Sequence, residues 1–249
     1  MTAELADRTA ILWDFDGVLY SYHTVDETLL NENFLGANAE GACQLIPSLS
    51  LEDAYDIAEQ GFIRYHDTVS AFVPYAEEQG LESGAFKRAL LAEQLKCTLR
   101  NIRKNVPDLI APCQETTELF EALSDHLSHV MITHAHRDYW ARPVAQNLGV
   151  EHFFSEIFGY AEFDFQNKGK SSHAVAMGLD HLGVTSDQAI FVEDQPRHLA
   201  KAKQDYPDLF TVFIEGPEPV DLPEYVDLMV PRPKDFLKLM VEQTNKEAA

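Results

Sequence analysis

Short apolar segments that alternate with helical patterns constrain this chain more than any other feature of its sequence. The apolar segments cover residues 9–13, 130–133, 156–160, 189–192 and 210–214, with a candidate sixth at 226–230. Each has the length and composition of a strand that is buried on both faces. Residues 115–127 and 172–182 instead place their apolar side chains on one side of a helix. This alternation predicts an α/β fold, a doubly wound parallel sheet covered by helices on both faces.

A long insertion follows the first predicted strand. Between residues 20 and 110 the pattern is helical; for example, Leu51, Ala54 and Ala58 recur on one helix face behind Ser50, a candidate N-cap. A structureless loop of this length is implausible inside a compact domain. The sequence therefore predicts a core domain made of residues 1–19 and 111–249, and a helical domain inserted at residues 20–110.

The composition narrows the classes of partner. The 249 residues carry a formal net charge of −22 at pH 7, which repels nucleic-acid backbones and anionic membrane surfaces. A phosphate substrate is repelled as well, so a phosphate site needs its own local cation. No apolar run is long enough to span a membrane, and the three cysteines are not spaced as a disulfide framework or a zinc site. We expect a cytoplasmic protein with no nucleic-acid or membrane partner; the sequence gives no indication of its oligomeric state.

Two acids follow the first predicted strand directly. Asp14 and Asp16 would share a face of an extended segment, and Gly17 allows the chain to turn so that both carboxylates converge on one pocket. An Asp-rich turn that merely ends the strand is the simpler interpretation of this segment.

Further polar residues stand at the ends of other predicted strands. They are Thr133, the adjacent acids Glu193 and Asp194, and the lysines Lys168 and Lys170 before a helix. The carboxyl ends of parallel strands meet at one edge of the sheet, where open α/β proteins bind ligands. Acids gathered there repel one another unless a cation is present. A hard divalent ion with oxygen ligands, Mg²⁺, answers that requirement.

Taken in order, these segments resemble the four motifs of the haloacid dehalogenase (HAD) superfamily, and specifically of its aspartate-nucleophile phosphatases with an inserted helical cap. The matching segments are Asp14-Phe15-Asp16-Gly17-Val18, Thr133, Lys168 or Lys170, and Glu193-Asp194, and they extend over essentially the whole chain. The resemblance implies a Rossmann-like core with its cap at residues 20–110. It also implies a magnesium-dependent phosphohydrolase acting on a small phosphorylated metabolite, such as a sugar phosphate or a nucleoside monophosphate.

The resemblance implies a catalytic role for each matched residue. Asp14 attacks phosphorus and forms an aspartyl-phosphate, while Asp16 protonates the leaving alcohol and later activates water. Thr133 hydrogen-bonds a phosphoryl oxygen, and the lysine stabilises the charge of nucleophile and phosphate. The dehalogenases of the superfamily lack the second acid, because they protonate no alkoxide, so Asp16 favours phosphate chemistry.

Binding roles follow from the same resemblance. The metal ligands implied are Asp14, Asp16 through its backbone carbonyl, Glu193 and Asp194. Gly17, His134 and Tyr20 are expected beside the substrate.

The third motif leaves two lysines open. The lysine of the family usually precedes a proline, whereas Gly169 follows Lys168 and Ser171 follows Lys170. Counted back from Glu193, Lys168 lies slightly beyond the usual spacing and Lys170 lies slightly short of it. We favour Lys170, because it lies beside the start of the helix predicted at residues 172–182.

Other interpretations stay open at this point. The same aspartyl-phosphate chemistry serves a phosphotransferase or sugar phosphomutase, and the fold can carry a catalytically quiet binding module. His134 and His136 could form a metal-binding pair on one face of a strand. A basic group at Lys96, Arg100, Arg103 and Lys104 is either a solvated surface or a cationic rim for an anionic substrate.

Overall fold

The structure, a computed structural model, divides the chain into two compact units. It describes residues 5, 7–20, 35–65, 67–93, 110–215 and 223–247. The first unit comprises Met1–Tyr22 and Ala111–Ala249, and the second comprises His23–Ile110, where the sequence predicts an insertion at 20–110. The basic group between Lys96 and Lys104 lies outside the described residues. Within the described ranges, no helix combines the length and apolar character needed to cross a membrane.

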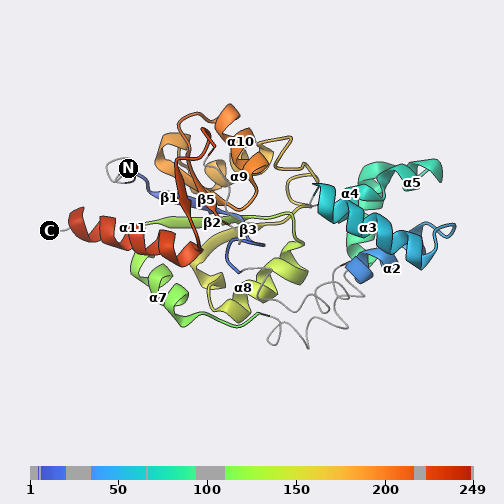
Figure 1. The fold of residues 1–249 in the computed structure, drawn as a ribbon, viewed down its shortest axis with the longest axis horizontal. Helices are drawn as coiled ribbons and strands as arrows, with labels where there is room; N and C mark the ends of the chain where they lie inside the picture. Colours follow the sequence, from blue (N-terminus) through green and yellow to red (C-terminus); the bar gives the residue numbers. More distant parts are fainter. Residues whose placement is uncertain are drawn as a thin grey trace. The chain divides into compact units, whose positions relative to one another are not determined.

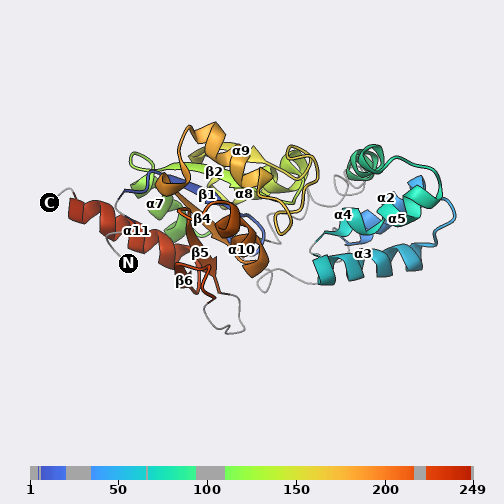
Figure 2. The same ribbon diagram turned by 90° about the horizontal axis from the view of Figure 1, so that it is seen from above.

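The first unit is built on a six-stranded sheet in which all neighbouring strands are parallel (Figures 1 and 2). The strands are β1 (Ala10–Trp13), β2 (Ser128–Ile132), β3 (Phe154–Phe158), β4 (Ala189–Glu193), β5 (Phe210–Ile214) and β6 (Leu228–Val230). Their order is β3-β2-β1-β4-β5-β6, which confirms the predicted doubly wound fold. The chain runs outward from β1 to β3 and then returns to β4, so the winding reverses between β1 and β4. Ligands bind at such a reversal in open α/β sheets.

Helices cover both faces of this sheet. They are α7 (Gln114–Leu123), α8 (Arg142–Leu148), α9 (His173–Leu182), α10 (Pro196–Asp205) and α11 (Pro233–Glu247). Figure 1 shows α9 and α10 on one face, and α7, α8 and α11 on the other. The approach of α9 is close, because a Cβ added to Gly178 would lie 2.9 Å from Leu12 Cδ2. Burial of both faces explains why β1 is apolar throughout and why β4 is apolar up to its last residue, Glu193.

Trp13 is the centre of the core beneath α7 and α11. Its ring centroid lies 5.3 Å from that of Phe120 in α7 and 5.8 Å from that of Phe236 in α11. The buried indole Nε1 donates a hydrogen bond to His129 Nδ1 on the neighbouring strand β2, at 3.1 Å. This bond satisfies a polar group that would otherwise be costly to bury.

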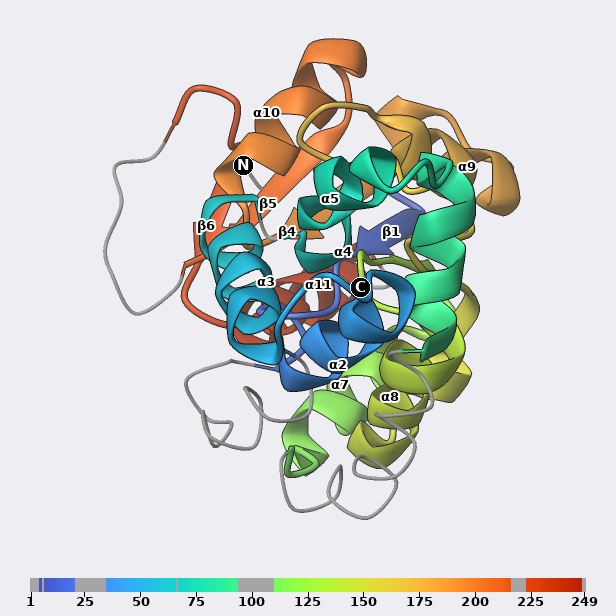
Figure 3. The ribbon, with the colours of Figure 1, turned by 90° about the vertical axis from the view of Figure 1, so that its right-hand side faces the viewer.

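The second unit is helical, with α2 (Gly36–Leu45), α3 (Leu51–Tyr65), α4 (Thr68–Ala71), α5 (Val73–Glu78) and helical residues 83–93 (Figure 3). Ser50 caps α3 as predicted, because its Oγ accepts the Asp53 N–H at 3.1 Å. Ala54 and Ala58 are buried, whereas Leu51 is 56% exposed, so the predicted apolar face does not extend to the start of the helix. The helices α2 and α4 both pack against α3, and Asn38 Nδ2 donates to Thr68 Oγ1 at 2.9 Å.

We predict that His129 makes stability fall in acid. Burial lowers the pKa of His129 to about 4, whereas an unfolded histidine titrates near 6.5. Between these values the unfolded state binds more protons than the native state, so stability falls as the pH falls from 6.5 towards 4. Urea unfolding at pH 7.5 and 4.5 should show this contribution as a loss of about 2–3 kcal/mol.

The matched variant is His129→Gln, which keeps an acceptor for the Trp13 indole and does not titrate. It should lose about 2–3 kcal/mol less than the native protein over this pH range, since other titrating groups are common to both. Equal losses in the two proteins would contradict the prediction.

Candidate active site

The site begins where β1 and β4 end side by side. Trp13 is paired with Val192 in the parallel register, and the Asp14 N–H donates to the Val192 carbonyl at 2.9 Å. Asp14 and Glu193, the next residues on the two strands, therefore stand together at the carboxyl edge of the sheet. Both are buried. The predicted convergence of acids from the first and fourth strands is present.

Lys168 lies between these two acids. Its Nζ is 2.6 Å from Asp14 Oδ1 and 2.8 Å from Glu193 Oε2, and it also donates to the Ile132 carbonyl at 3.2 Å. Only 3% of the residue is exposed. Burial acts to lower the pKa of Lys168, but the charges of Asp14 and Glu193 outweigh it and raise that pKa above its usual value. The lysine is therefore a fixed cation.

The structure places Lys168, and not the preferred Lys170, between these acids. Lys170 is exposed, and its backbone N–H closes a turn by donating to the Asn167 carbonyl at 2.9 Å. Two residues earlier, the Lys168 N–H donates to His134 Nε2 at 3.0 Å, which holds that part of the loop against the end of β2. Spacing along the sequence could not separate the two lysines, because it does not reveal where the turn falls.

Glu193 makes four contacts that use both carboxylate oxygens. Oε1 accepts the backbone N–H groups of Asp194 and Gln195 at 3.0 and 3.1 Å, and Oε2 lies 2.8 Å from Lys168 Nζ and 2.9 Å from His198 Nδ1. Burial acts to raise the pKa of Glu193, but Lys168 and His198 hold it well below its usual value. His198 was not identified from the sequence, where its only signal is its place in the first turn of the helix after the acid pair.

The Gly17 backbone lies directly against the Asp194 carboxylate. Gly17 has a φ of +83°, and a Cβ at this position would lie 2.2 Å from Asp194 Oδ2. Any other residue would displace this carboxylate, so the glycine is required by packing as well as by backbone conformation. Gln195 Nε2 donates to the same oxygen at 3.1 Å. Burial and the nearby charge of Glu193 raise the pKa of Asp194 well above its usual value.

Asp16 is the half-buried acid on the loop after β1. Oδ1 accepts hydrogen bonds from the Tyr20 hydroxyl and from Trp140 Nε1, the latter at 2.7 Å, and Oδ2 is 3.4 Å from Thr133 Oγ1. Burial raises the pKa of Asp16, although the hydrogen bonds from Tyr20 and Trp140 oppose that rise. Tyr20 was expected at the substrate, yet its hydroxyl is engaged with Asp16. Trp140 was not identified from the sequence.

Thr133 and His134 follow β2 and face this group. The Thr133 Oγ1 accepts the Ala135 N–H at 3.0 Å, which orients the hydroxyl near Asp16. The ring of His134 packs at a centroid distance of 5.2 Å from His198. His134 uses Nε2 to hold the backbone of Lys168, and His136 uses Nδ1 to accept the Asp138 N–H at 3.3 Å. These contacts occupy the two rings that the alternative metal pair would need.

The donor set at the strand ends fits a divalent cation. Burial and the charge of Glu193 raise the pKa of Asp14 well above its usual value, and they do the same for Asp194. The two carboxylates therefore have room for a further positive charge beside that of Lys168. Among the described residues, ligand atoms of Asp14, Glu193 and His198 lie within 4.8 Å of one another. Gly17 leaves space for a carboxylate against the loop backbone. In this cluster Glu193 and His198 contact each other at 2.9 Å, which leaves the carboxylate oxygens of Asp14 and Asp194 as the kind of ligand that Mg²⁺ prefers.

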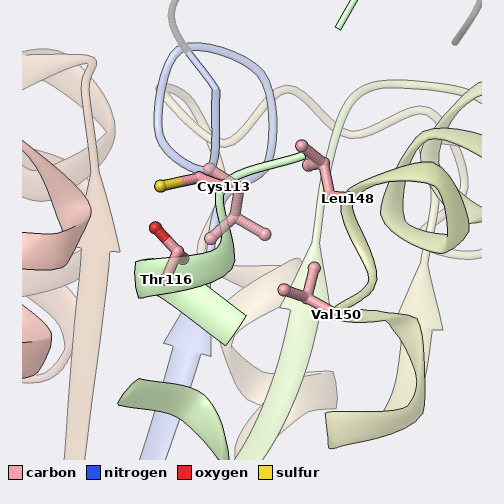
Figure 4. A pocket seen from close by; sticks show the side chains of 5 residues that line it. Cys113, Thr116, Leu148 and Val150 are labelled. Atoms are coloured by element: carbon pink, nitrogen blue, oxygen red, sulfur yellow. The ribbon is translucent and has the colours of Figure 1, made fainter. Parts of the chain in front are cut away.

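A pocket elsewhere in the first unit has a different lining. It is lined by Leu19, Cys113, Thr116, Leu148 and Val150. Figure 4 shows the Cys113 sulfur and the Thr116 hydroxyl near the start of α7, with Leu148 at the end of α8 and Val150 just after it. Among the described residues, its lining contains no carboxylate, lysine or histidine, so the acid and lysine group remains the candidate site.

Comparison with known families identifies the fold and its class. The family model for haloacid dehalogenase-like hydrolases matches residues 9–204, which include every motif residue described above. The chain belongs to the haloacid dehalogenase-like hydrolases. It is therefore a member of an enzyme family, and the expected HAD membership is confirmed. No curated protein sequence matches the chain.

Solved HAD structures with different activities share this fold. A β-phosphoglucomutase from Clostridium difficile is 16% identical with a TM-score of 0.63, over 97% of this chain and 99% of that one. A 2-haloacid dehalogenase from Pseudomonas syringae pv. Tomato DC3000 is 13% identical with a TM-score of 0.60, over 94% and 99%. A HAD phosphatase from Thermococcus onnurineus is 14% identical with a TM-score of 0.58, over 93% and 97%. At these identities the likeness concerns the fold alone.

The two lysines give a direct test of the site geometry. Removing one partner of a buried ion pair leaves uncompensated charge, so Lys168→Ala should lower the free energy of unfolding by about 3–5 kcal/mol. Lys170→Ala removes an exposed side chain and should change it by less than about 0.5 kcal/mol. Urea unfolding of both variants measures the difference. Similar values for the two would contradict the arrangement around Lys168.

Proposed function

We propose that this HAD-like hydrolase is a magnesium-dependent phosphohydrolase that cleaves a small phosphomonoester through an aspartyl-phosphate on Asp14. The observation that carries the proposal is the pair of acids on one loop, Asp14 bound to a buried cation and Asp16 bound to neutral donors. Two carboxylates with such different surroundings suit the two tasks of nucleophile and proton carrier.

The first step is phosphoryl transfer to the enzyme. A carboxylate oxygen of Asp14 forms a bond to phosphorus while the bond from phosphorus to the leaving oxygen breaks, and Asp16 gives its proton to that oxygen. Lys168 orients Asp14 and stabilises negative charge on the nucleophile and the phosphoryl group. Thr133 is available as a hydrogen-bond donor to a phosphoryl oxygen.

The second step regenerates the enzyme. Water attacks phosphorus, Asp16 takes up its proton, and the bond between phosphorus and the Asp14 oxygen breaks to release inorganic phosphate. Asp16 then carries the proton needed for the next leaving group. The cycle consumes one water for each ester and returns both acids to their starting state.

Asp14, Asp194 and the Asp16 backbone carbonyl are the proposed ligands of Mg²⁺. When bound, the ion supplies positive charge that keeps the carboxylates ionised and neutralises the phosphoryl oxygens. Glu193 was expected among the ligands, but its four contacts support a different role, as the anchor of Lys168. His198 and the two backbone amides then hold that anchor.

Asp16 also separates the proposal from the other activities of the family. A halide leaves as a stable anion and needs no proton, whereas an alkoxide does, so a second acid favours phosphate esters over haloacids. A phosphotransferase or phosphomutase would use the same two acids and return the phosphoryl group to a hydroxyl. The fate of that group is therefore part of the test.

The helical unit and the charge of the chain complete the proposal. We assign the second unit, His23–Ile110, as the cap that excludes water during attack on phosphorus. The substrate is a small phosphorylated metabolite, since the formal net charge of −22 disfavours nucleic acids and anionic membranes. A cytoplasmic location agrees with cysteines that are not spaced as a disulfide framework.

The deciding experiment is phosphate release from a panel of phosphorylated metabolites with Mg²⁺, measured beside the alcohol product. Phosphate and alcohol should appear in equal amounts, chelation should abolish turnover, and Mg²⁺ should restore it better than Ca²⁺. Asp14→Asn should lower turnover by orders of magnitude while leaving the protein folded.

Three outcomes would contradict the proposal. Full turnover after exhaustive chelation would show that the reaction needs no metal. Recovery of the phosphoryl group on a second hydroxyl would show that the protein is a phosphotransferase and not a hydrolase. Release of halide from 2-haloacids, with no turnover of phosphate esters, would assign the chain to the dehalogenases of its family.

A further inference from the structure

Two hydrogen-bond donors converge on one oxygen of Asp16. The Tyr20 hydroxyl and the Trp140 indole both donate to Oδ1, and Trp140 Nε1 is also 3.1 Å from the Tyr20 oxygen. Tyr20 and Trp140 are each only 7% exposed. The three polar groups thus form a closed triangle away from solvent, between segments that are 120 residues apart in sequence.

We propose that Tyr20 and Trp140 are positioning residues that fix the Asp16 carboxylate so that Oδ2 is its proton-carrying atom. This proposal rests on the proposed function, because it assigns a role within that proton transfer. Oδ1 already accepts two hydrogen bonds, so a proton on the acid belongs on the other oxygen. Oδ2 is the oxygen that faces the Thr133 hydroxyl, at 3.4 Å.

The backbone around Trp140 supports a specific role. Residues Arg137–Ala141 form a π-helical turn directly before α8. Such turns are rare and occur frequently at functional sites. The His136 side chain caps this turn by accepting the Asp138 N–H, and the His136 carbonyl accepts the Trp140 N–H at 3.0 Å. The segment that delivers the indole to Asp16 is therefore itself held in place.

Positioning is needed because the terminal torsion of an aspartate is broad. A carboxylate without fixed donors rotates and presents either oxygen, whereas general acid catalysis needs the proton within hydrogen-bond reach of the leaving oxygen. Phe15 packs edge-on against the Tyr20 ring at a centroid distance of 5.4 Å, which restrains that donor too. Loss of either donor should therefore affect proton transfer more than substrate binding.

The kinetic test uses Trp140→Phe and Tyr20→Phe, which keep the rings and remove the donors. Tyr206→Phe, at the far end of α10, is the matched control. With an alkyl phosphate, kcat should fall roughly tenfold to a hundredfold in each test variant, a part of the contribution of general acid catalysis. KM should change little. With p-nitrophenyl phosphate, whose leaving group needs little protonation, kcat should fall less than about threefold.

The second part of the kinetic test makes the same substitutions in an Asp16→Ala background. Trp140→Phe should then cause no further fall with the alkyl phosphate, because the group that it positions is gone. Equal losses on both substrates, or a full additional loss in the Asp16→Ala background, would overturn the proposal and leave Trp140 as ordinary packing.

A spectroscopic measurement tests the contact without any turnover. The chain has two tryptophans, so its indole N–H region holds two signals. Asp16→Ala should shift the signal that Trp140→Phe removes and leave the Trp13 signal, bonded to His129, in place. If Trp140→Phe does not fold, Asp16→Ala alone decides, because two unmoved indole signals would overturn the proposal.

Failure of this inference differs from failure of the proposed function. If the native protein hydrolyses no phosphate ester, the proposed function fails and the positioning role falls with it. If the native protein turns over phosphate esters and Asp16→Ala impairs alkyl substrates, but neither donor variant does, this inference alone is wrong.

Discussion

The buried cation of Lys168 is the interaction on which the rest of the site depends. It joins the acids that end β1 and β4 and the carbonyl at the end of β2, so three neighbouring strand ends share one ammonium group. Buried charge of this kind is tolerated only when paired and hydrogen-bonded. Glu193 meets that condition with four contacts, which fixes the position of Lys168 against Asp14.

The surroundings of the two loop acids separate their chemistry. Asp14 lies against an ammonium group and beside other carboxylates, so its ionised form depends on local positive charge. Asp16 is held by neutral donors that fix its orientation without adding charge. In the proposed function, one short loop thereby supplies both the nucleophile and the proton carrier, and Gly17 leaves room for Asp194 beside them.

The parallel sheet and the polar residues at its strand ends could be predicted because buried strands are marked in the sequence by short apolar segments that alternate with helical patterns. The order of the strands in the sheet was not predicted. Lys168 could not be separated from Lys170, since the choice depends on where a turn falls and on a backbone bond to His134. Trp140 and His198 were also missed. Trp140 reaches Asp16 from a turn that is 124 residues away in sequence, and such a contact exists only after the chain has folded. His198 follows Glu193 by five residues in the first turn of α10, where no motif of the sequence marks it.

The most direct test of the account is to locate the phosphoryl group on the enzyme. The Asp16→Ala variant, incubated with Mg²⁺ and p-nitrophenyl phosphate, should accept the phosphoryl group without needing an acid and lose it slowly without a base. Mass spectrometry of its peptides should then place a single phosphoryl group on Asp14, and Asp14→Asn in the same background should remove it. Turnover with the phosphoryl group on another residue, or with no covalent adduct at all, would contradict the account.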